Sequence, residues 1–405
     1  MTELYYKYAN LLLTKGLCIK ENQPLVVNAP LEAVDFIRIL TKVACSKKIT
    51  DIYYDWQDDE IEHTLLENYQ QVHIENSSFW DKSIHEEYAK KNAAFLFLTS
   101  SSGNIMQDIP ATKIKIANAH KLKTRQLYRQ LQSDNKIKWC IAAVATEKWG
   151  RLVFPNDKNP KEKLWHTIFD ICLINEEEPC LSWKNKMNYN QELCQKLTNL
   201  NIKTLNYRNN LGTNLKIELP FHAIWCGGDS YILGDKPIVN IPTEEVFTTP
   251  NKFKTSGIVY CSKPLIHEGI TIENIVLEFQ DGKVIKYDAT TGKQELENIL
   301  SFDSESSMLG EVALVDYNSK ISKTNLLFYE TLFDENASCH IALGRGFKEC
   351  LENGYNLNEQ ELEQNGYNKS VNHIDIMIGT HDLEIIATTY DEQKIIIFKD
   401  GHFNI

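Results

Sequence analysis

Short apolar runs alternate with amphipathic helical patterns through the first 175 residues, and this alternation constrains the fold more than any other feature. The apolar runs lie at 23–29, 50–56, 93–100 and 137–146. The helical patterns lie between and after them, at 33–44, 111–132 and 162–174. Strands separated by helices are typical of βαβ units and a parallel sheet. We therefore predict an α/β N-terminal domain with a mainly parallel sheet over residues 1–180.

After residue 200 the pattern changes to β-rich segments with turn signals between them. The predicted strands lie at 202–208, 214–220, 257–265, 275–289, 311–317, 325–330, 373–379 and 394–401. The run 277–287 reads as a hairpin, because Asp281-Gly282 is a preferred two-residue turn. A charged, proline-containing stretch at 175–188 breaks the earlier pattern, and a helix carrying Leu193 and Leu197 follows it. We predict a second, α+β and mostly antiparallel domain over residues 181–405.

Composition excludes several classes of protein. A formal net charge of −12 argues against a nucleic-acid partner, since phosphate binding needs a basic surface. No stretch approaches the 18 or so uninterrupted apolar residues of a membrane span. The first 25 residues hold no cationic segment followed by a long apolar run, and the ten cysteines form no C-x-x-C pair. We expect a cytoplasmic protein with reduced thiols and no membrane association.

The strand predicted at 373–379 carries His373 and Asp375 two residues apart, on one face of a segment apolar enough for a core. An unpaired charge in such surroundings costs several kcal/mol, so both groups need a partner. Another side chain, water or a metal ion could fill that role. Three other segments of the second half place ionisable residues beside apolar runs, and they contain Glu244, Glu245, Glu311, Asp334, Glu335 and His340.

Each of these residues also has an ordinary structural explanation. A glutamate before a strand is usually solvated or holds a turn, and a histidine in an apolar segment is usually a hydrogen-bonded core residue. Together, however, they offer carboxylates and imidazoles, the ligands that suit zinc, cobalt or manganese. Two such ions bridged by carboxylates hydrolyse esters and amides with an activated water. From the residue types alone, a metallohydrolase is one hypothesis among several.

Several long segments, in the same order along the chain, resemble the metalloaminopeptidase family that includes aminopeptidases T, S and II. The matching segments are "EKLWHTIFD", "NIPTEEVFTTP", "SGIVYCSKPL", "LGEVALV", "LLFYETLFDENASCHIALG" and "VNHIDIMIG". The resemblance covers essentially the whole chain. It implies a homodimer, peptide substrates and a dinuclear metal site in the C-terminal domain.

The resemblance also implies which residues bind the two divalent ions, which would be zinc, cobalt or manganese. The expected ligands are Glu245, Glu311, Glu335, His340, His373 and Asp375. The expected general base is Glu245 or its neighbour Glu244, which would take a proton from the metal-activated water.

One position departs from the family pattern. The family usually has a tyrosine seven residues after the histidine of "HIALG", near the scissile bond, and this chain has Phe347 there. The phenolic hydroxyl is therefore missing, and Tyr355 is a nearby candidate to replace it. Two rivals to an aminopeptidase remain at this point. One is another dinuclear metallohydrolase such as a phosphoesterase, and the other is a non-catalytic relative that binds peptide or metal.

Overall fold

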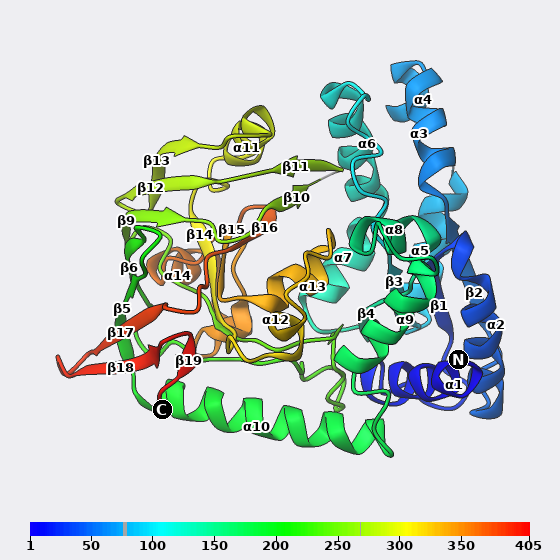
Figure 1. Ribbon diagram of the computed structural model, residues 1–405, viewed down its shortest axis with the longest axis horizontal. Helices are drawn as coiled ribbons and strands as arrows, with labels where there is room; N and C mark the ends of the chain where they lie inside the picture. Colours follow the sequence, from blue (N-terminus) through cyan, green and yellow to red (C-terminus); the bar gives the residue numbers. More distant parts are fainter. Residues whose placement is uncertain (76–78, 268) are drawn as a thin grey trace. The chain divides into compact units, whose positions relative to one another are not determined.

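The chain forms two compact units in a computed structural model that describes residues 1–75, 79–267 and 269–405 (Figure 1). Unit 1 comprises Met1–Lys184 and Asp229–Pro242, and unit 2 comprises Asn185–Gly228 and Thr243–Ile405. The chain therefore passes from one unit to the other three times. Residues 229–242, which the sequence analysis placed in the second half, belong to unit 1 because their strand β7 (Asn240–Ile241) pairs with a strand of the parallel sheet.

The sheet of unit 1 is parallel throughout, as predicted, with strand order β2-β1-β3-β4-β7. Its other strands are β1 (Leu25–Pro30), β2 (Ile52–Gln57), β3 (Ala94–Thr99) and β4 (Trp139–Ala143). Strand β1 lies inside the sheet, with β2 on one side and β3 on the other. All three connections to β2, β3 and β4 contain helices, because parallel neighbours need a crossover.

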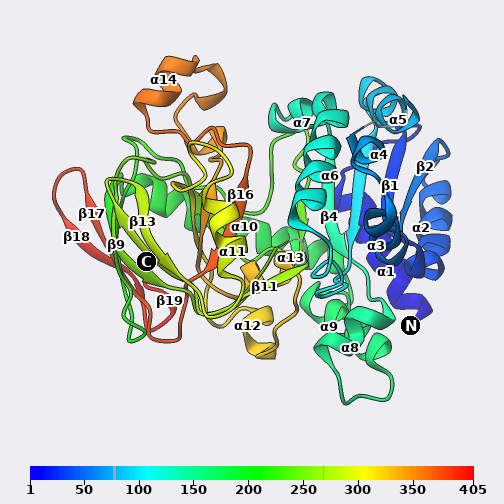
Figure 2. The same ribbon diagram turned by 90° about the horizontal axis from the view of Figure 1, so that it is seen from above.

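Helices cover both faces of this sheet (Figure 2). On one face, α1 (Thr2–Leu11), α2 (Val34–Ser46) and α9 (Pro160–Ile171) pack through the rings of Tyr5, Tyr8, Phe36, Trp165 and Phe169. On the other face, α5 (Phe79–Lys90) and α7 (Gln126–Ser133) bury Ala89 and Tyr128 against Val26 and Phe95. The remaining helices of the unit are α3 (Asp59–Asn68), α4 (Gln71–Glu75), α6 (Ala111–Thr124) and α8 (Glu147–Val153).

Two helical predictions need correction. The helix expected over 111–132 is two helices, α6 and α7, which meet at Arg125. The break expected through 175–188 ends earlier, since α10 (Pro179–Asn199) begins at Pro179 and continues past Leu193. Proline fits the first turn of a helix because its missing N–H has no partner there anyway. The proline thus marks the start of a long helix, on which Lys184 is exposed and Lys186 is partly buried.

Unit 2 is built mainly from antiparallel strands, as predicted. Its larger sheet has the order β13-β12-β9-β6-β5-β17-β18-β19. These strands are β5 (Ile202–Arg208), β6 (Asn214–Glu218), β9 (Thr255–Tyr260), β12 (Val276–Gln280), β13 (Lys283–Asp288), β17 (Glu384–Thr389), β18 (Lys394–Lys399) and β19 (His402–Phe403). The predicted hairpin is β12–β13, and Asp281 and Gly282 have φ of 49° and 84°, the left-handed values that its tight turn requires.

A smaller antiparallel sheet, β16-β15-β14-β8, packs against the larger one. It comprises β8 (Val246–Thr248), β14 (Leu309–Leu314), β15 (His340–Gly344) and β16 (His373–Met377). Val312, Ile341 and Ile376 on its apolar face share one core cluster with Leu205 and Val259 of the larger sheet. Strands β10 (Leu265–His267) and β11 (Ile270–Ile272) form a separate ribbon. The helices that follow α10 are α11 (Lys293–Leu300), α12 (Lys320–Thr324), α13 (Thr331–Asp334) and α14 (Glu359–Gln364).

The strand predicted at 325–330 is wrong. Its backbone N–H groups at Phe328 and Glu330 donate to the carboxylate of Asp334, at 2.9 and 3.1 Å, and so bind a side chain in place of a neighbouring strand. Burial raises the pKa of this carboxyl group to about 6, against the effect of those N–H donors. The Asp334 side chain therefore stabilises a loop at 328–330, where the sequence had predicted a strand. Among the helices that the structure describes, none is both long and apolar enough to cross a bilayer.

Candidate metal centre

The polar face of the small sheet carries the residues singled out in the sequence. Opposite residues of antiparallel neighbours point to the same side, so the pairings Glu311–Ala342–Asp375 and Ala313–His340 place these side chains on one face. The intervening residues of that sheet, including Val312, Ile341, Ile374 and Ile376, point into the core. The alternation of a strand thus sends ionisable side chains one way and apolar side chains the other.

Small residues leave space between the ionisable ones. Ala342 lies between Glu311 and Asp375 in the sheet, and Gly344 lies opposite His373. Gly344 has φ of 98°, and a Cβ atom there would come 2.3 Å from the Asn372 carbonyl oxygen. A larger residue at this position would shift the strand that carries His373 and Asp375.

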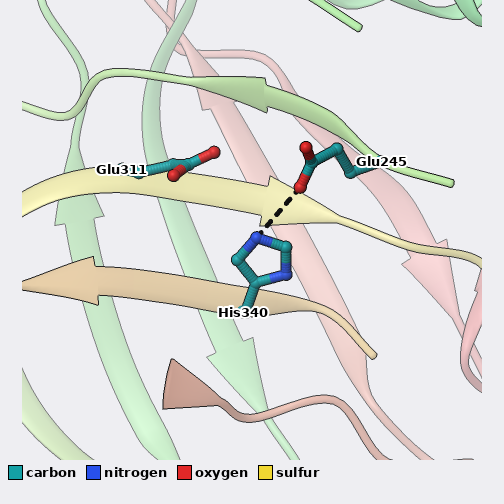
Figure 3. A group of neighbouring side chains, drawn as sticks. All are labelled: Glu245, Glu311 and His340. Carbon is teal, nitrogen blue, oxygen red and sulfur yellow. Dashed lines mark ion pairs between the residues drawn. The ribbon is translucent and has the colours of Figure 1, made fainter. Parts of the chain in front are cut away.

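Two groups of possible metal ligands meet on this face. The side chains of Glu245, Glu311 and His340 each offer one atom within 4.8 Å of the others, and Glu311, His373 and Asp375 do the same. Figure 3 shows the first group, in which His340 Nε2 lies 3.0 Å from Glu245 Oε2. In the second group His373 Nε2 lies 3.1 Å from Glu311 Oε2 and 3.3 Å from Asp375 Oδ1. Glu311 belongs to both groups.

Both imidazoles are oriented by backbone carbonyl groups. His340 Nδ1 lies 3.1 Å from the Ser338 carbonyl oxygen, and His373 Nδ1 lies 2.7 Å from that of Arg345. A carbonyl oxygen can only accept, so Nδ1 carries the proton and Nε2 is left facing the carboxylates. This arrangement is the usual one for a metal-binding histidine, in which a second hydrogen bond fixes the tautomer.

Burial and crowding shift the pKa values of the carboxyl groups. Burial, together with the negative charges of Asp375 and Glu245, raises the pKa of Glu311 to about 7. Burial and the neighbouring carboxylates raise that of Glu335 well above its ordinary value. Asp375 goes the other way: burial raises its pKa, but the charges of His373 and His340 and the hydrogen bonds from His373 and Glu335 together lower it.

The histidines respond to the same carboxylates. Burial opposes the imidazolium form, but the bond to Glu245 raises the pKa of His340 to about 10. Asp375 and Glu311 likewise overcome burial and raise the pKa of His373 well above its ordinary value. The cluster therefore attracts positive charge strongly, and a divalent cation would supply that charge where protons otherwise do.

Asp375 gives an independent indication that the residues fit a metal. Its Oδ1 is buried and has no properly formed hydrogen bond to any described residue, although His373 Nε2 lies 3.3 Å away. A buried carboxylate oxygen without a donor is costly. Coordination to a cation would satisfy it, and the carboxylate and imidazole donors are those that borderline divalent ions take.

The other predicted site residues lie beside these two groups. Glu335 is in the turn after α13, and a hydrogen bond from its carboxyl group helps to lower the pKa of Asp375. The side chain of Glu244 does not join its neighbour Glu245 in the ligand groups. It forms a 2.6 Å ion pair with Lys186. The Phe347 ring packs edge-on against the His373 ring at 5.2 Å, and the Tyr355 hydroxyl donates to Glu349 at 2.8 Å.

Sequence reasoning missed two residues that hold the site in place. Asn336 is fully buried, accepts from the Glu244 N–H at 2.7 Å, and donates to Glu335 Oε1 at 3.3 Å. It thus ties the loop before β8 to the turn before β15. Lys186, on α10, fixes the side chain of Glu244. The only sequence signal for Asn336 was its place between Glu335 and an apolar run.

Comparison with known proteins decides the family. The model of the family described as "Thermophilic metalloprotease (M29)" matches residues 1–403. The chain belongs to the thermophilic metalloprotease family. The resemblance noted in the sequence is thereby confirmed.

Members of this family resemble the chain over its full length. "Aminopeptidase AmpS" of Bacillus subtilis (strain 168) is 36% identical, with 98% of this chain and 97% of that protein covered. "Aminopeptidase 2" of Geobacillus stearothermophilus is 34% identical over the same shares. The solved structure "Wild-type AmpT from Thermus thermophilus" matches with a TM-score of 0.92 at 28% identity, covering 99% of each chain. The fold is therefore shared by proteins of this family.

Proposed function

We propose that this protein is a metal-dependent aminopeptidase that releases N-terminal residues from peptides. The full-length family match and the names of the relatives support this reaction. The observation that carries the proposal is the pair of ligand groups that share Glu311 on one buried sheet face. A site for peptide hydrolysis by paired ions needs a carboxylate positioned to serve both.

In this proposal Glu245, Glu311 and His340 would hold one divalent ion, and Glu311, His373 and Asp375 would hold the other. Glu311 belongs to both groups and would serve both ions, and Glu335 would add a carboxylate beside Asp375. Zinc, cobalt and manganese all suit these donors. When bound, the ions supply Lewis acidity toward the scissile carbonyl and an activated water near neutral pH.

The residues of the chain do the positioning. The carbonyl groups of Ser338 and Arg345 keep both Nε2 atoms turned toward the carboxylates. Burial of Glu245, Glu311 and His340, each less than a tenth exposed, keeps bulk water from screening their charges. A carboxylate beside the nucleophilic water takes its proton as general base, and Glu245 and Glu244 are the candidates. The ion pair with Lys186 holds the Glu244 side chain in place.

Metal removal tests the proposal. The protein is dialysed against EDTA, and hydrolysis of a panel of aminoacyl-p-nitroanilides is measured before and after zinc, cobalt or manganese is added back. We expect activity to disappear and to return with at least one ion. Full activity in protein shown by elemental analysis to be free of metal would contradict the proposal. Hydrolysis of p-nitrophenyl phosphate without hydrolysis of any anilide would favour a phosphoesterase. The homodimer and the cytoplasmic location stay predictions from the sequence.

A further inference from the structure

Unit 1 contains a crevice of about 480 Å³ that lies outside the metal centre. Its lining comes from the carboxyl ends of three neighbouring parallel strands and the residues that follow them, namely 30–32 at the end of β1, 57–60 at the end of β2 and 97–102 at the end of β3. Asn28 of β1, Ile141 of β4, and Thr146 and Lys148 after β4 also line it. The volume is in the range of roughly 300–1,000 Å³ that small-molecule sites occupy.

The crevice lies where the direction of chain winding changes. From β1 the chain moves to β2 on one side, and it later returns to place β3 on the other side. The loops that leave β1 and β3 therefore diverge in opposite directions and open a gap between them. In open α/β sheets, ligands bind in this gap at the carboxyl ends of the strands.

The charges in the crevice exclude the anionic ligands that such gaps often hold. Glu32, Asp58, Asp59 and Glu60 line it against one ammonium group, that of Lys148, which already lies 3.3 Å from Glu60 Oε1. Two of these carboxylates also accept from backbone N–H groups beside the crevice. Asp58 Oδ1 accepts from the first turn of α3 at 3.0 Å, and Glu32 Oε2 accepts from the Glu147 N–H at 3.0 Å.

Acceptor atoms and apolar surface remain for a ligand. Thr99 Oγ1, in the lining, is buried and has no hydrogen-bond partner among the described residues. Asp58 and Glu32 each use one carboxylate oxygen in the bonds above, which leaves a second oxygen on each. Leu31, Phe97 and Leu98 give the crevice an apolar side. Its size and this apolar side fit an organic molecule better than a bare metal ion, which needs several oxygens within about 2.6 Å.

We propose that this crevice binds a small aliphatic amine, with an ammonium group among the carboxylates and its methylene chain against the apolar side. Two sources share this chemistry: a free diamine or polyamine, and an amino acid with a basic side chain. The second source also carries a carboxylate, which the acidic lining would repel. The inference is independent of the metal centre and stands whether or not the proposed peptidase reaction is correct.

Calorimetric titration of the full-length, metal-loaded protein tests the proposal, with 1,4-diaminobutane, lysine, inorganic phosphate and calcium chloride as separate probes. We expect saturable binding of the diamine, weaker binding of lysine, and no binding of phosphate. Tighter binding of lysine than of the diamine would identify the amino acid as the source. Binding of calcium in place of either amine would overturn the proposal, and so would the absence of heat with both amines.

Variants locate the binding. Asp58→Asn with Glu60→Gln removes two charges, and asparagine still caps α3. We expect affinity for the diamine to fall about tenfold or more, the scale for losing charged hydrogen-bond acceptors. The control is Glu176→Gln with Glu177→Gln, which makes the same charge change at exposed positions of unit 1. An equal loss in the control would show non-specific attraction and overturn the proposal.

Two further variants test whether the Thr99 hydroxyl contributes to amine binding and whether the amine binds at the metal centre instead. Thr99→Val deletes the unpartnered hydroxyl at nearly constant volume, and we expect it to weaken diamine binding without lowering the melting temperature. Glu311→Gln alters the metal centre and should leave diamine binding unchanged. Loss of diamine binding in Glu311→Gln but not in the Asp58/Glu60 variant would assign the amine to the metal centre and overturn the proposal.

Discussion

The two units use their sheets differently to place polar side chains. In unit 2 four of the candidate ligands, Glu311, His340, His373 and Asp375, are on a strand face, within β14, β15 and β16, and the opposite side of each strand is packed core. In unit 1 the polar groups of the crevice follow the ends of the strands, in the connections after β1, β2 and β3. Side chains built on packed strands are held more exactly than side chains on loops. The difference matches what each site would do: hold ions at fixed spacing, or accept a flexible ligand.

The energetic demands of the two sites differ as well. Glu311 and His340 are 4% and 1% exposed, so their charges depend on the neighbouring charged side chains, His373 for Glu311 and Glu245 for His340, and not on water. Glu32 and Glu60 of the crevice are exposed, and water already solvates them. Removing one charge should therefore have a far larger effect in the buried cluster than in the crevice.

The largest effect is expected from Glu311→Gln. The amide keeps the shape of the side chain but cannot offer the same charge to both ligand groups. Because metal ions supply several kcal/mol of transition-state stabilisation, kcat should fall on the order of a thousandfold, with reduced metal content. Anilide hydrolysis measures kcat, and elemental analysis measures the metal content. As a control, Glu278→Gln on β12 of the larger sheet should keep full activity. Wild-type turnover in Glu311→Gln would make Glu311 an ordinary strand glutamate.

A smaller effect is expected when a buried lysine of either unit loses its charge. Lys252 in unit 2 is 1% exposed and pairs with Glu305 and Glu363 at 2.7 and 2.9 Å. Lys252→Met should lower the free energy of unfolding by about 3 kcal/mol, the low end of the range for breaking a buried pair, because Glu363 is half exposed. Denaturant unfolding followed by fluorescence measures this.

The matched variants are Lys203→Met and Lys138→Met. Lys203 pairs with Glu392 at the surface, where water screens both charges, so its loss should cost far less stability than the loss of Lys252. Lys138 is 3% exposed and pairs with Asp235 within unit 1. Its replacement should destabilise unit 1 and leave the unfolding of unit 2 unchanged. Equal stability of Lys252→Met and the wild type would show that the ion pairs contribute nothing net.

The smaller of the two expected effects on turnover comes from Phe347→Tyr. If a hydroxyl here donates to the developing oxyanion, restoring it should raise kcat tenfold or more, within the 2.7–4 kcal/mol or so that one such donor contributes. The ring packs against His373, so an added hydroxyl lies close to the metal centre. The measurement is kcat on a well-cleaved aminoacyl-anilide. Tyr355→Phe should leave kcat unchanged, because that hydroxyl is bonded to Glu349. A loss in Tyr355→Phe, with no gain in Phe347→Tyr, would instead make Tyr355 the donor.

The parallel sheet could be predicted because helical patterns separate its strands, and because β1 and β3 are buried and read as nearly continuous apolar runs. Strand β7 could not be predicted, because a strand of two residues has no periodicity and its partner β4 is about a hundred residues earlier in the chain. The segment 325–330 was mistaken for a strand because its apolar residues look the same whether a neighbouring strand or the Asp334 side chain accepts their N–H groups.

For the candidate site, the residue types indicated only a class of ligands. The positions came from the resemblance to a family, and the structure brings five of those residues into the two ligand groups, with Glu335 beside them. Asn336 and Lys186 escaped notice because their importance depends on which distant loop they reach. Contacts of this kind have no local signature in a sequence.

The short strand β7 has a consequence for how this protein can be divided. It returns to unit 1 after the chain has already built the start of unit 2, and it covers the free edge of β4. A gene fragment that stops at residue 180 would encode a sheet with an uncovered edge, open to pairing with other chains. Residues 1–180 are therefore not a complete unit, and recombination that exchanges the halves of two relatives would have to carry residues 229–242 with the first half.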